Sequence, residues 1–391
     1  MKKISERIYS VGVNDNDKVL FEGLWPLPFG VSYNSYVIAD EKIALIDTVE
    51  SGFEEEFLGN IVEATGGRPV DYLVVNHMEP DHSSLISYML ESYPDLKIIA
   101  NAKALPMLKG YHNVQDERVL VVSEGQTVSL GGSTLSFHMI PMVHWPETMV
   151  TWLSEENTVF SGDAFGTFGV VADEIVDTED TFDQYRDEMI RYYSNIVGKY
   201  GTPVQSALKK LSGLPVERIC STHGPVWENN IGNVISLYDR LSRYEVERGV
   251  CVVYGSMYGN TAAAADALVS ELEARGIPCA VHDLAGNNAG ELGVSGALRD
   301  VFKYEYKVKA LNGFIHVMED SVLNPVILIH DITLNRYHYS NASDSLSVNP
   351  QPKQQEEKMS EAEEKRFRDT KRRLDAATPR TGKMIEVEER E

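Results

Sequence analysis

The sequence predicts two consecutive domains of mixed architecture: an α+β domain built of stacked sheet and helix layers, and an α/β domain after it. Over residues 1–248, short apolar runs bounded by Gly, Asn and Asp alternate with helical stretches, which is typical of such layers. Near residue 249 a polar segment separates a helix from a new strand. A strand, a small polar loop and an Ala-rich helix then follow in the order of an α/β unit.

Length, charge and cysteine content limit the classes of function. The 391 residues suit two to three domains of about 150 residues each. A net charge of −23 disfavours nucleic acid and anionic membrane surfaces as partners, because both would repel the chain. The sequence contains neither a run of about 20 apolar residues nor the apolar stretch of a secretory signal. Three cysteines without paired spacing argue against disulfides and a thiolate zinc site, so we expect a cytoplasmic protein.

The first domain is expected to contain several strands and to end with a helix. Apolar runs typical of strands are residues 35–39, 43–47, 72–75, 119–122 and 148–153. Apolar side chains then recur with a helical period over 231–244. The polar residues 245–249 follow, and a new strand opens at Val250, which places the first domain at residues 1–248.

The second domain, residues 249–339, begins clearly and then loses its pattern. Its predicted elements are a strand at 250–254, a helix over about 262–275 and a strand at 279–284. After about residue 286 only two further strands are indicated, at 313–317 and 326–330. Residues 340–391 are polar and dense in charge, so we expect a tail without stable structure.

The segment most informative about function is 76–82, Asn-His-Met-Glu-Pro-Asp-His, directly after an apolar run. In an extended chain alternate side chains share a face, which brings His77, Glu79 and Asp81 together. Three more candidate ligands also follow apolar runs, namely His144, Asp163 and His223. Each of these alone would more often be a buried histidine or a turn aspartate. Their occurrence together predicts a metal site, because strand ends deliver side chains to one place.

The order of these motifs resembles the flavodiiron proteins, also called A-type flavoproteins. The shared features are His-x-Glu-x-Asp-His at 77–82, a later single His, Gly-Asp at 162–163 and His-Gly-Pro at 223–225. The resemblance covers residues 1–285 and includes Leu-Pro-Phe-Gly at 27–30 and His-Trp-Pro-Glu-Thr at 144–148. It implies a metallo-β-lactamase-like αββα sandwich followed by a flavodoxin-like α/β domain. Hydrolases of the same superfamily usually carry His at the position of Glu79.

The resemblance implies a centre of two irons. It assigns one iron to His77, Glu79 and His144 and the other to Asp81 and His223, with Asp163 as the bridge. Three imidazoles and three carboxylates form a nitrogen and oxygen environment without thiolate, which suits iron or manganese. Glu79 adds negative charge compared with an imidazole, and this charge stabilises the higher oxidation state of a redox metal.

Two further residues are catalytic candidates from the same resemblance. It leaves His82 outside the ligand set, where the imidazole would orient a ligand or donate to bound oxygen. It also places a tyrosine of the pair Tyr192 and Tyr193 near the irons, and we select Tyr193. A buried structural tyrosine is the alternative for either position.

Residues 252–261 are expected to form a strand, a loop and a helix start that cradle a phosphate. This loop resembles the FMN phosphate loop of the family, although Gly255 stands where an acidic residue is often found. The candidate FMN contacts are Ser256, Met257, Tyr258, Gly259, Asn260 and Thr261. Residues 286–391 lack the two loops that normally enclose the flavin ring, a Gly-Ser-Pro-Thr-Tyr-like segment and an aromatic, Gly-rich loop. Divergence and a frameshift or fusion both remain open as explanations.

The expected function is therefore that of an oxidoreductase in electron transport, reducing O2 to water, NO to N2O, or both, as in oxygen and nitric oxide detoxification. The resemblance implies a rubredoxin-like or NADH-linked electron donor. It also implies a head-to-tail homodimer, or a dimer of dimers, in which the flavin of one subunit faces the irons of the other. Two alternatives remain: a dinuclear zinc metallohydrolase, and a redox-impaired relative with a defective flavin domain.

Overall fold

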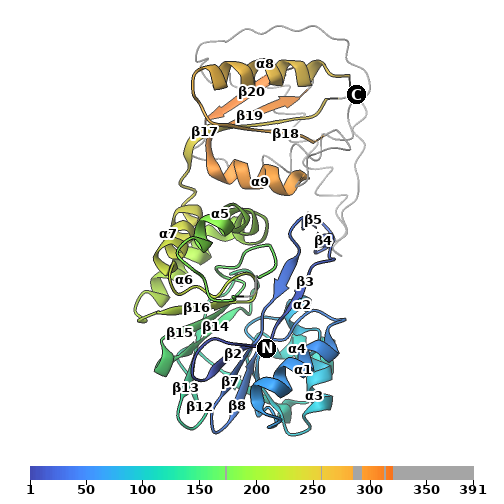
Figure 1. Ribbon diagram of the computed structural model, residues 1–391, viewed down its shortest axis with the longest axis vertical. Helices are drawn as coiled ribbons and strands as arrows, with labels where there is room; N and C mark the ends of the chain where they lie inside the picture. Colours follow the sequence, from blue (N-terminus) through green and yellow to red (C-terminus); the bar gives the residue numbers. More distant parts are fainter. Residues whose placement is uncertain (172–173, 257, 285–292, 312–313, 320–391) are drawn as a thin grey trace, which may run out of the picture. The chain divides into compact units, whose positions relative to one another are not determined.

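The computed structural model describes residues 1–391 except 172–173, 257, 285–292, 312–313 and 320–391 (Figure 1). Its first sheet has seven strands in the order β1-β2-β7-β8-β9-β10-β11. Their bounds are β1 (Lys2–Lys3), β2 (Ile8–Ser10), β7 (Tyr36–Ala39), β8 (Ile43–Ile46), β9 (Tyr72–Val74), β10 (Lys97–Asn101) and β11 (Val119–Val122). Neighbours pair antiparallel from β1 to β8 and parallel from β8 to β11.

The second sheet has five strands in the order β12-β13-β14-β15-β16. Their bounds are β12 (Thr127–Ser129), β13 (Thr134–Met139), β14 (Met149–Leu153), β15 (Thr158–Gly162) and β16 (Arg218–Ser221). Only β15 and β16 pair in parallel. Two small antiparallel ribbons join β3 (Val13–Asp15) to β6 (Val31–Tyr33) and β4 (Leu20–Phe21) to β5 (Trp25–Pro26).

Alternation along the strands builds two apolar cores. In β8, Ala44 and Ile46 belong to a core that also contains Phe160 and Cys220 of the second sheet, so this core lies between the sheets. The other side chains of β8 point the opposite way, into a second core that contains side chains of the outer helices. Every residue of β8 is buried, as expected for a strand covered on both faces.

Helices cover the outer faces of both sheets (Figure 1). Those beside the first sheet are α1 (Glu54–Thr65), α2 (Pro80–Ser83), α3 (Ile86–Ser92) and α4 (Leu105–His112). Those beside the second sheet are α5 (Thr181–Tyr192), α6 (Gly201–Leu211) and α7 (Ile231–Ser242). A π-helical turn, Tyr193–Val197, continues α5, and 3-10 turns occupy Asp116–Arg118, Ser154–Glu156 and Gly198–Tyr200. The result is the αββα sandwich that the sequence predicts.

A separate four-stranded sheet, in the order β18-β17-β19-β20, follows. Its elements are β17 (Glu247–Tyr254), α8 (Asn260–Ala274), β18 (Cys279–Asp283), α9 (Gly293–Lys303), β19 (Tyr304–Leu311) and β20 (Phe314–Glu319). Strands β18, β17 and β19 pair in parallel, and β20 pairs antiparallel with β19. Val250 and Val252 of β17 pack with residues of α8, whereas Cys251 and Val253 pack with residues of α9. The two helices therefore cover opposite faces of this α/β sheet (Figure 1).

Several boundaries differ from the sequence expectation. β17 begins at Glu247, before the predicted start at Val250, while the domain boundary itself stays a prediction. α9 and β19 were not predicted, although apolar residues recur at helical spacing within 293–303. The predicted strand at 326–330 and the tail at 340–391 lie outside the described residues. None of the helices in the described part of the chain has the length and apolar character that crossing a bilayer requires.

Candidate metal centre

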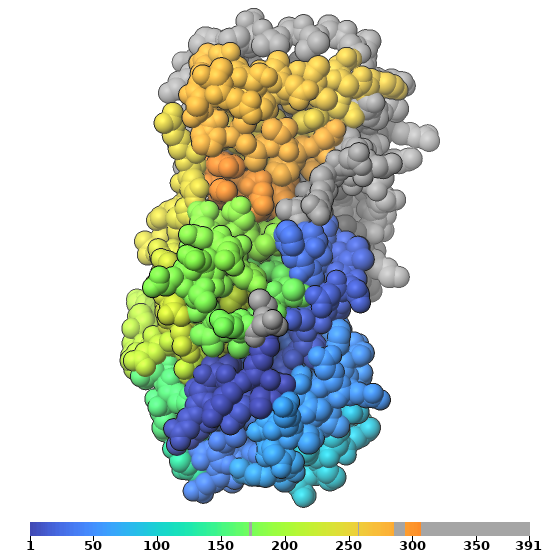
Figure 2. All heavy atoms as spheres, in the orientation of Figure 1, coloured from blue at the N-terminus to red at the C-terminus, as the bar shows by residue number. Residues whose placement is uncertain are grey.

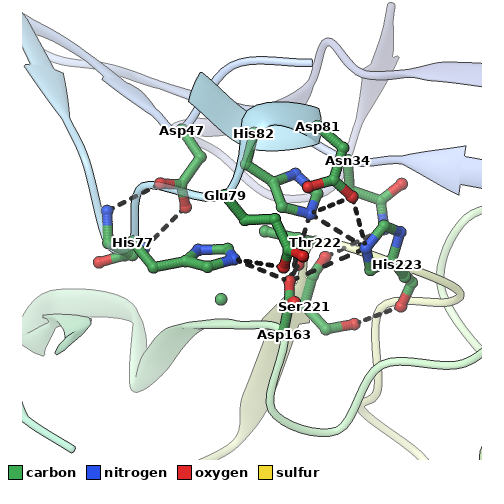
Figure 3. A network of polar contacts seen from close by, with 12 residues as sticks. Asn34, Asp47, His77, Glu79, Asp81, His82, Asp163, Ser221, Thr222 and His223 are labelled. Carbon is green, nitrogen blue, oxygen red and sulfur yellow. Dashed lines mark hydrogen bonds and ion pairs between the residues drawn. The ribbon is translucent and has the colours of Figure 1, made fainter. Parts of the chain in front are cut away.

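The predicted ligands reach one place from separate segments of the two sheets (Figure 3). His77 and Glu79 lie in the loop after β9, Asp163 directly follows β15, and His223 follows β16. His144 was expected at a strand end, but β13 stops at Met139 and His144 lies in the loop before β14. The extended segment was expected to continue through Asp81, but Pro80 starts helix α2 there, as proline often does at a first helical position.

Four of these side chains form the first half of the centre: His77, Glu79, His144 and Asp163. His144 Nε2 lies 2.8 Å from Glu79 Oε2 and 3.0 Å from Asp163 Oδ2. His77 Nε2 lies 3.4 Å from Asp163 Oδ1 and 3.6 Å from Glu79 Oε2. All four ligand atoms lie within 4.8 Å of one another, a spacing compatible with one shared metal ion.

Asp81, His82 and His223 form the second half. His82 Nε2 lies 3.0 Å from His223 Nε2 and 3.2 Å from Asp81 Oδ2. Asp163 reaches this half as well, since its Oδ1 lies 3.2 Å from His82 Nε2. One carboxylate therefore contacts imidazoles of both halves, which is the position expected of a bridge.

His82 lies beside the second half of the centre, and its role as an orienting group or as a ligand stays a prediction. The resemblance leaves this imidazole outside the ligand set, but its Nε2 lies among the ligand-type atoms of the second half (Figure 3). The side chain is fully buried and comes from α2, one residue after Asp81. Because consecutive residues in this first helical turn both point inward, the sequence pattern alone does not separate a ligand from its neighbour.

The side chains fit metal ions chemically. The ring nitrogens of His77 and both carboxylate oxygens of Asp81 are buried without a hydrogen-bond partner among the described residues. Such groups are costly unless a cation or a proton satisfies them. Two imidazole Nε2 atoms at 3.0 Å also suit a shared cation, because neutral imidazoles present lone pairs to metals.

The charges of the centre also fit bound metal ions. Burial raises the pKa of Asp163, but His77 and His144 more than offset this and hold it well below the ordinary value. Burial lowers the pKa of His82 and His144, yet neighbouring carboxylates raise them to about 10 and about 9. Asp163 is therefore ionised at neutral pH, and His82 and His144 carry protons that a bound metal cation would replace.

Surrounding groups hold the ligands in orientation. His223 Nδ1 donates to the carbonyl oxygen of Ser32 at 2.7 Å, which leaves Nε2 free for a metal. Thr222 Oγ1 donates to Asp163 Oδ1. Asp47 accepts hydrogen bonds from the backbone and side-chain nitrogens of Asn76, next to His77. Asp47 follows an apolar run, the same signal as Asp163, so the sequence could have identified it.

A cavity of about 620 Å³ opens on the first half of the centre. Its walls include Glu79, His144, Glu22 and Trp25, together with residues of the π-helical turn. Partial burial of its carboxyl group and the nearby Glu79 carboxylate raise the pKa of Glu22 to about 7. Over the whole residue, Glu22 is exposed. The sequence contains no signal for Glu22, because it belongs to no ligand motif.

The two tyrosines differ from the expectation. Tyr192 lies beside the second half, with its ring centroid 5.5 Å from that of His223 and its hydroxyl buried without a described partner. Tyr193 instead packs against Tyr238 and Phe302, at 5.0 and 6.1 Å. The placement is corrected from Tyr193 to Tyr192, because successive helical residues point about 100° apart and only one faces the centre.

The predicted phosphate loop lies between β17 and α8. Gly259 adopts a positive φ of 86° directly before the helix, and its backbone nitrogen donates to Ser256 Oγ at 3.1 Å. Among the described residues, no atom outside the adjoining chain lies within 4 Å of where a Gly259 side chain would begin, and Tyr258 is 87% exposed. The loop is therefore open in front of a helix N-terminus, which fits a phosphate group. Met257 lies outside the described residues.

The fold and the site together define a metallo-β-lactamase-like protein with a two-metal centre and an attached α/β domain. Residues 31–224 match the family described as ODP family beta lactamase. The anaerobic nitric oxide reductase flavorubredoxin of Escherichia coli O1:K1 / APEC is 31% identical over 351 residues, covering 87% of this chain and 70% of that protein. The chain belongs to the flavodiiron protein family.

Solved structures agree with this family. A flavoprotein from Thermotoga maritima has a TM-score of 0.72 and 27% identity, covering 79% of this chain and 78% of that one. The rubredoxin:oxygen oxidoreductase from Desulfovibrio gigas has a TM-score of 0.74 and 25% identity, covering 86% and 82%. The expected fold class, the metallo-β-lactamase-like sandwich with a flavodoxin-like domain, is confirmed.

Proposed function

We propose that this chain is a flavodiiron oxidoreductase that reduces O2 to water, NO to N2O, or both, with two irons and FMN as cofactors. The observation that carries the proposal is Glu79, whose carboxylate stands 2.8 Å from His144 within the first half of the centre. The corresponding hydrolases usually have a neutral imidazole there. An added negative charge favours a metal that must reach a higher oxidation state, as gas reduction requires.

The geometry supports a specific ligand set. One iron would be held by His77, Glu79 and His144, the other by Asp81, His82 and His223, with Asp163 between them. When bound, the two irons would bind the gas and supply electrons to it. Phe21 and Tyr192 form an apolar wall against His223, which limits water around the second half. The cavity of about 620 Å³ leaves room for a diatomic gas to reach the first half.

The electron path and partners are part of the proposal. FMN would bind with its phosphate where the loop with Ser256 and Gly259 meets Asn260 and Thr261 at the start of α8. The names of two similar proteins, flavorubredoxin and rubredoxin:oxygen oxidoreductase, support a rubredoxin-like donor over an NADH-linked one. We further propose a cytoplasmic location and head-to-tail pairing of chains, so that the flavin of one subunit faces the irons of another.

A zinc metallohydrolase is the second candidate, and His82 favours it. In zinc relatives the corresponding histidine is a ligand, and here its Nε2 lies 3.2 Å from Asp81 and 3.0 Å from His223. The metal content and the visible absorption spectrum of the purified protein separate the candidates. Two irons and a flavin spectrum support the oxidoreductase, whereas two zinc ions without flavin support the hydrolase.

The variant Glu79→His tests the proposal directly. We expect iron to be replaced by zinc and gas reduction with an artificial reductant to be lost, because the anionic ligand is gone while the fold persists. The matched control is Glu55→His, in the exposed first turn of α1, which should keep two irons and full turnover. Unchanged oxygen and NO consumption by a folded Glu79→His variant would contradict the proposed role of the carboxylate.

A further inference from the structure

We propose that Glu147 is a positioning residue of the metal centre, whose carboxylate joins the two loops that carry the ligands of its first half. The inference rests on the metal centre proposed above. Glu147 lies three residues after His144, and the backbone nitrogen of Met78 donates to its Oε1 at 2.9 Å. Met78 separates the two expected ligands His77 and Glu79. One hydrogen bond therefore connects the backbone between two ligands to the loop of a third.

This hydrogen bond is withdrawn from water. Glu147 and Met78 are each 1% exposed, so bulk water does not compete for the Met78 nitrogen. The other carboxylate oxygen of Glu147, Oε2, is buried without a hydrogen-bond partner among the described residues. Burying such a group is costly, and an apolar side chain of similar size would avoid the cost. The bond to Met78 explains why a carboxylate occupies this position.

The chain before His77 is held by the neighbouring strand. The carbonyl oxygen of Asn76 accepts from the Met149 nitrogen at 2.9 Å, and Asn76 Oδ1 accepts from Thr151 Oγ1 at 2.8 Å. Both donors belong to β14, which closely follows Glu147 in the sequence. Glu147 adds the contact on the other side of the ligand, so the chain is held both before and after His77.

The loop of Glu147 is itself fixed. Asn101 Nδ2 donates to the carbonyl oxygen of Glu147. The Thr148 nitrogen donates to the Trp145 carbonyl oxygen at 3.2 Å, which closes a turn over residues 145–148. Segments far apart in the sequence adjoin in this domain, as blue and green atoms do in Figure 2, so a side chain of one can orient another. Ligands restricted in this way bind metal more tightly than flexible ones.

Three substitutions separate the hydrogen bond from charge and packing. Glu147→Gln keeps an oxygen that can accept from the Met78 nitrogen and removes only the charge. Glu147→Leu fills a similar volume but has no acceptor. The matched control is Glu156→Leu, because Glu156 also has a buried oxygen without a described partner. Glu156 lies before β15, at the opposite end of that strand from Asp163.

The experiment titrates metal-free protein with cobalt(II) and follows both the affinity and the d–d absorption bands. We expect two cobalt ions per chain for the parent, Glu147→Gln and Glu156→Leu, with affinities within threefold and unchanged bands. Glu147→Leu should bind one of the two ions at least about tenfold more weakly and shift its band, the size of effect that orienting groups have. If Glu147→Leu does not fold, Glu147→Met carries the same expectation, since its thioether is unbranched and only a weak acceptor.

Each outcome has one meaning. Parental affinity and bands in Glu147→Leu overturn the inference, because the bond to Met78 then does not matter. Equal weakening in Glu147→Gln also overturns it, since charge rather than the acceptor would be responsible. Equal weakening in Glu156→Leu overturns it as well, because a general loss of stability would explain the effect. A parent chain that takes up no cobalt contradicts the proposed metal centre itself, whereas a parent with two ions confines any failure to the role of Glu147.

Discussion

Asp163 connects the two halves of the metal centre at the level of single atoms. Its Oδ1 lies 3.4 Å from His77 and 3.2 Å from His82, while Oδ2 lies 3.0 Å from His144. In the described part of the chain, no other carboxylate contacts histidines of both ligand groups. A carboxylate with two oxygens serves two cations at once, so its loss affects both.

We expect Asp163→Ala to lower iron content from two per chain to at most one, measured by metal analysis after anaerobic loading. Thr222→Val is the matched control, because it removes only the hydroxyl that donates to Asp163 Oδ1 and leaves the carboxylate in place. The control should keep two irons. Two irons in Asp163→Ala would show that the carboxylate is not the bridge.

Some residues of the centre were predictable and others were not, for physical reasons. His77, Asp163 and His223 follow buried strands, so their sequence position reports their place in the sheet. The positions of His82 and Tyr192 beside the second half were not predictable, because facing inward depends on helical rotation that a motif does not fix. Glu22, which lines the cavity with Glu79 and His144, was missed, since it belongs to no ligand motif and lies far from both residues in sequence.

At the level of elements, strands covered on both faces were the easiest to predict. Residues 43–47 correspond to β8 and 148–153 to β14, and every residue of both strands is buried. The apolar run 140–143 was misinterpreted as a strand end, because an apolar run also forms when a loop is buried against the ligands. The helix at 293–303 was missed, although Val294, Leu298 and Val301 recur at the spacing of a buried helical face.

One contact between these later elements allows a test of stability. His282 Nε2 on β18 lies 2.9 Å from Asp300 Oδ2 on α9, and Arg299 Nη2 lies 3.0 Å from the same oxygen. Burial raises the pKa of Asp300, but these two hydrogen-bonding partners outweigh it and hold the pKa below the ordinary value. The ionised Asp300 carboxylate therefore stabilises the folded state fully above about pH 4. This stabilisation is lost as the pH falls through the lowered pKa of Asp300.

We expect Asp300→Asn to destabilise α9 by about 2 kcal/mol at pH 7, the usual contribution of hydrogen bonds to a buried charge. The difference from the parent should shrink once the pH falls below about 4. Amide hydrogen exchange of peptides from 293–303 measures it, with both proteins compared at each pH. Glu271→Gln, in an exposed ion pair with Arg275, is the control and should change stability by less than about 0.5 kcal/mol. A pH-independent difference would contradict the role of the Asp300 charge.

At the scale of the whole molecule, function depends on whether electrons enter through a flavin bound to the second domain. The phosphate loop before α8 is present, with Gly259 in the left-handed region and an open space in front of it. The sequence of 286–391 lacks the segments that normally enclose the flavin ring. We therefore expect the phosphate end of FMN to contribute more to binding than the flavin ring.

We expect FMN to bind more weakly than about 1 μM, because each lost stacking contact removes about 0.5–1.5 kcal/mol, so that two or three losses weaken binding about five- to two-thousandfold. Titration of metal-loaded protein, followed by quenching of flavin fluorescence, measures the affinity. Riboflavin, which lacks the phosphate, is the matched control ligand and should bind at least about tenfold more weakly still. Submicromolar binding of both ligands would mean that residues 286–391 build a ring site of a different kind. Weak FMN binding with no preference over riboflavin would contradict the assignment of the phosphate loop, because Ser256 to Thr261 would then contribute nothing to recognition.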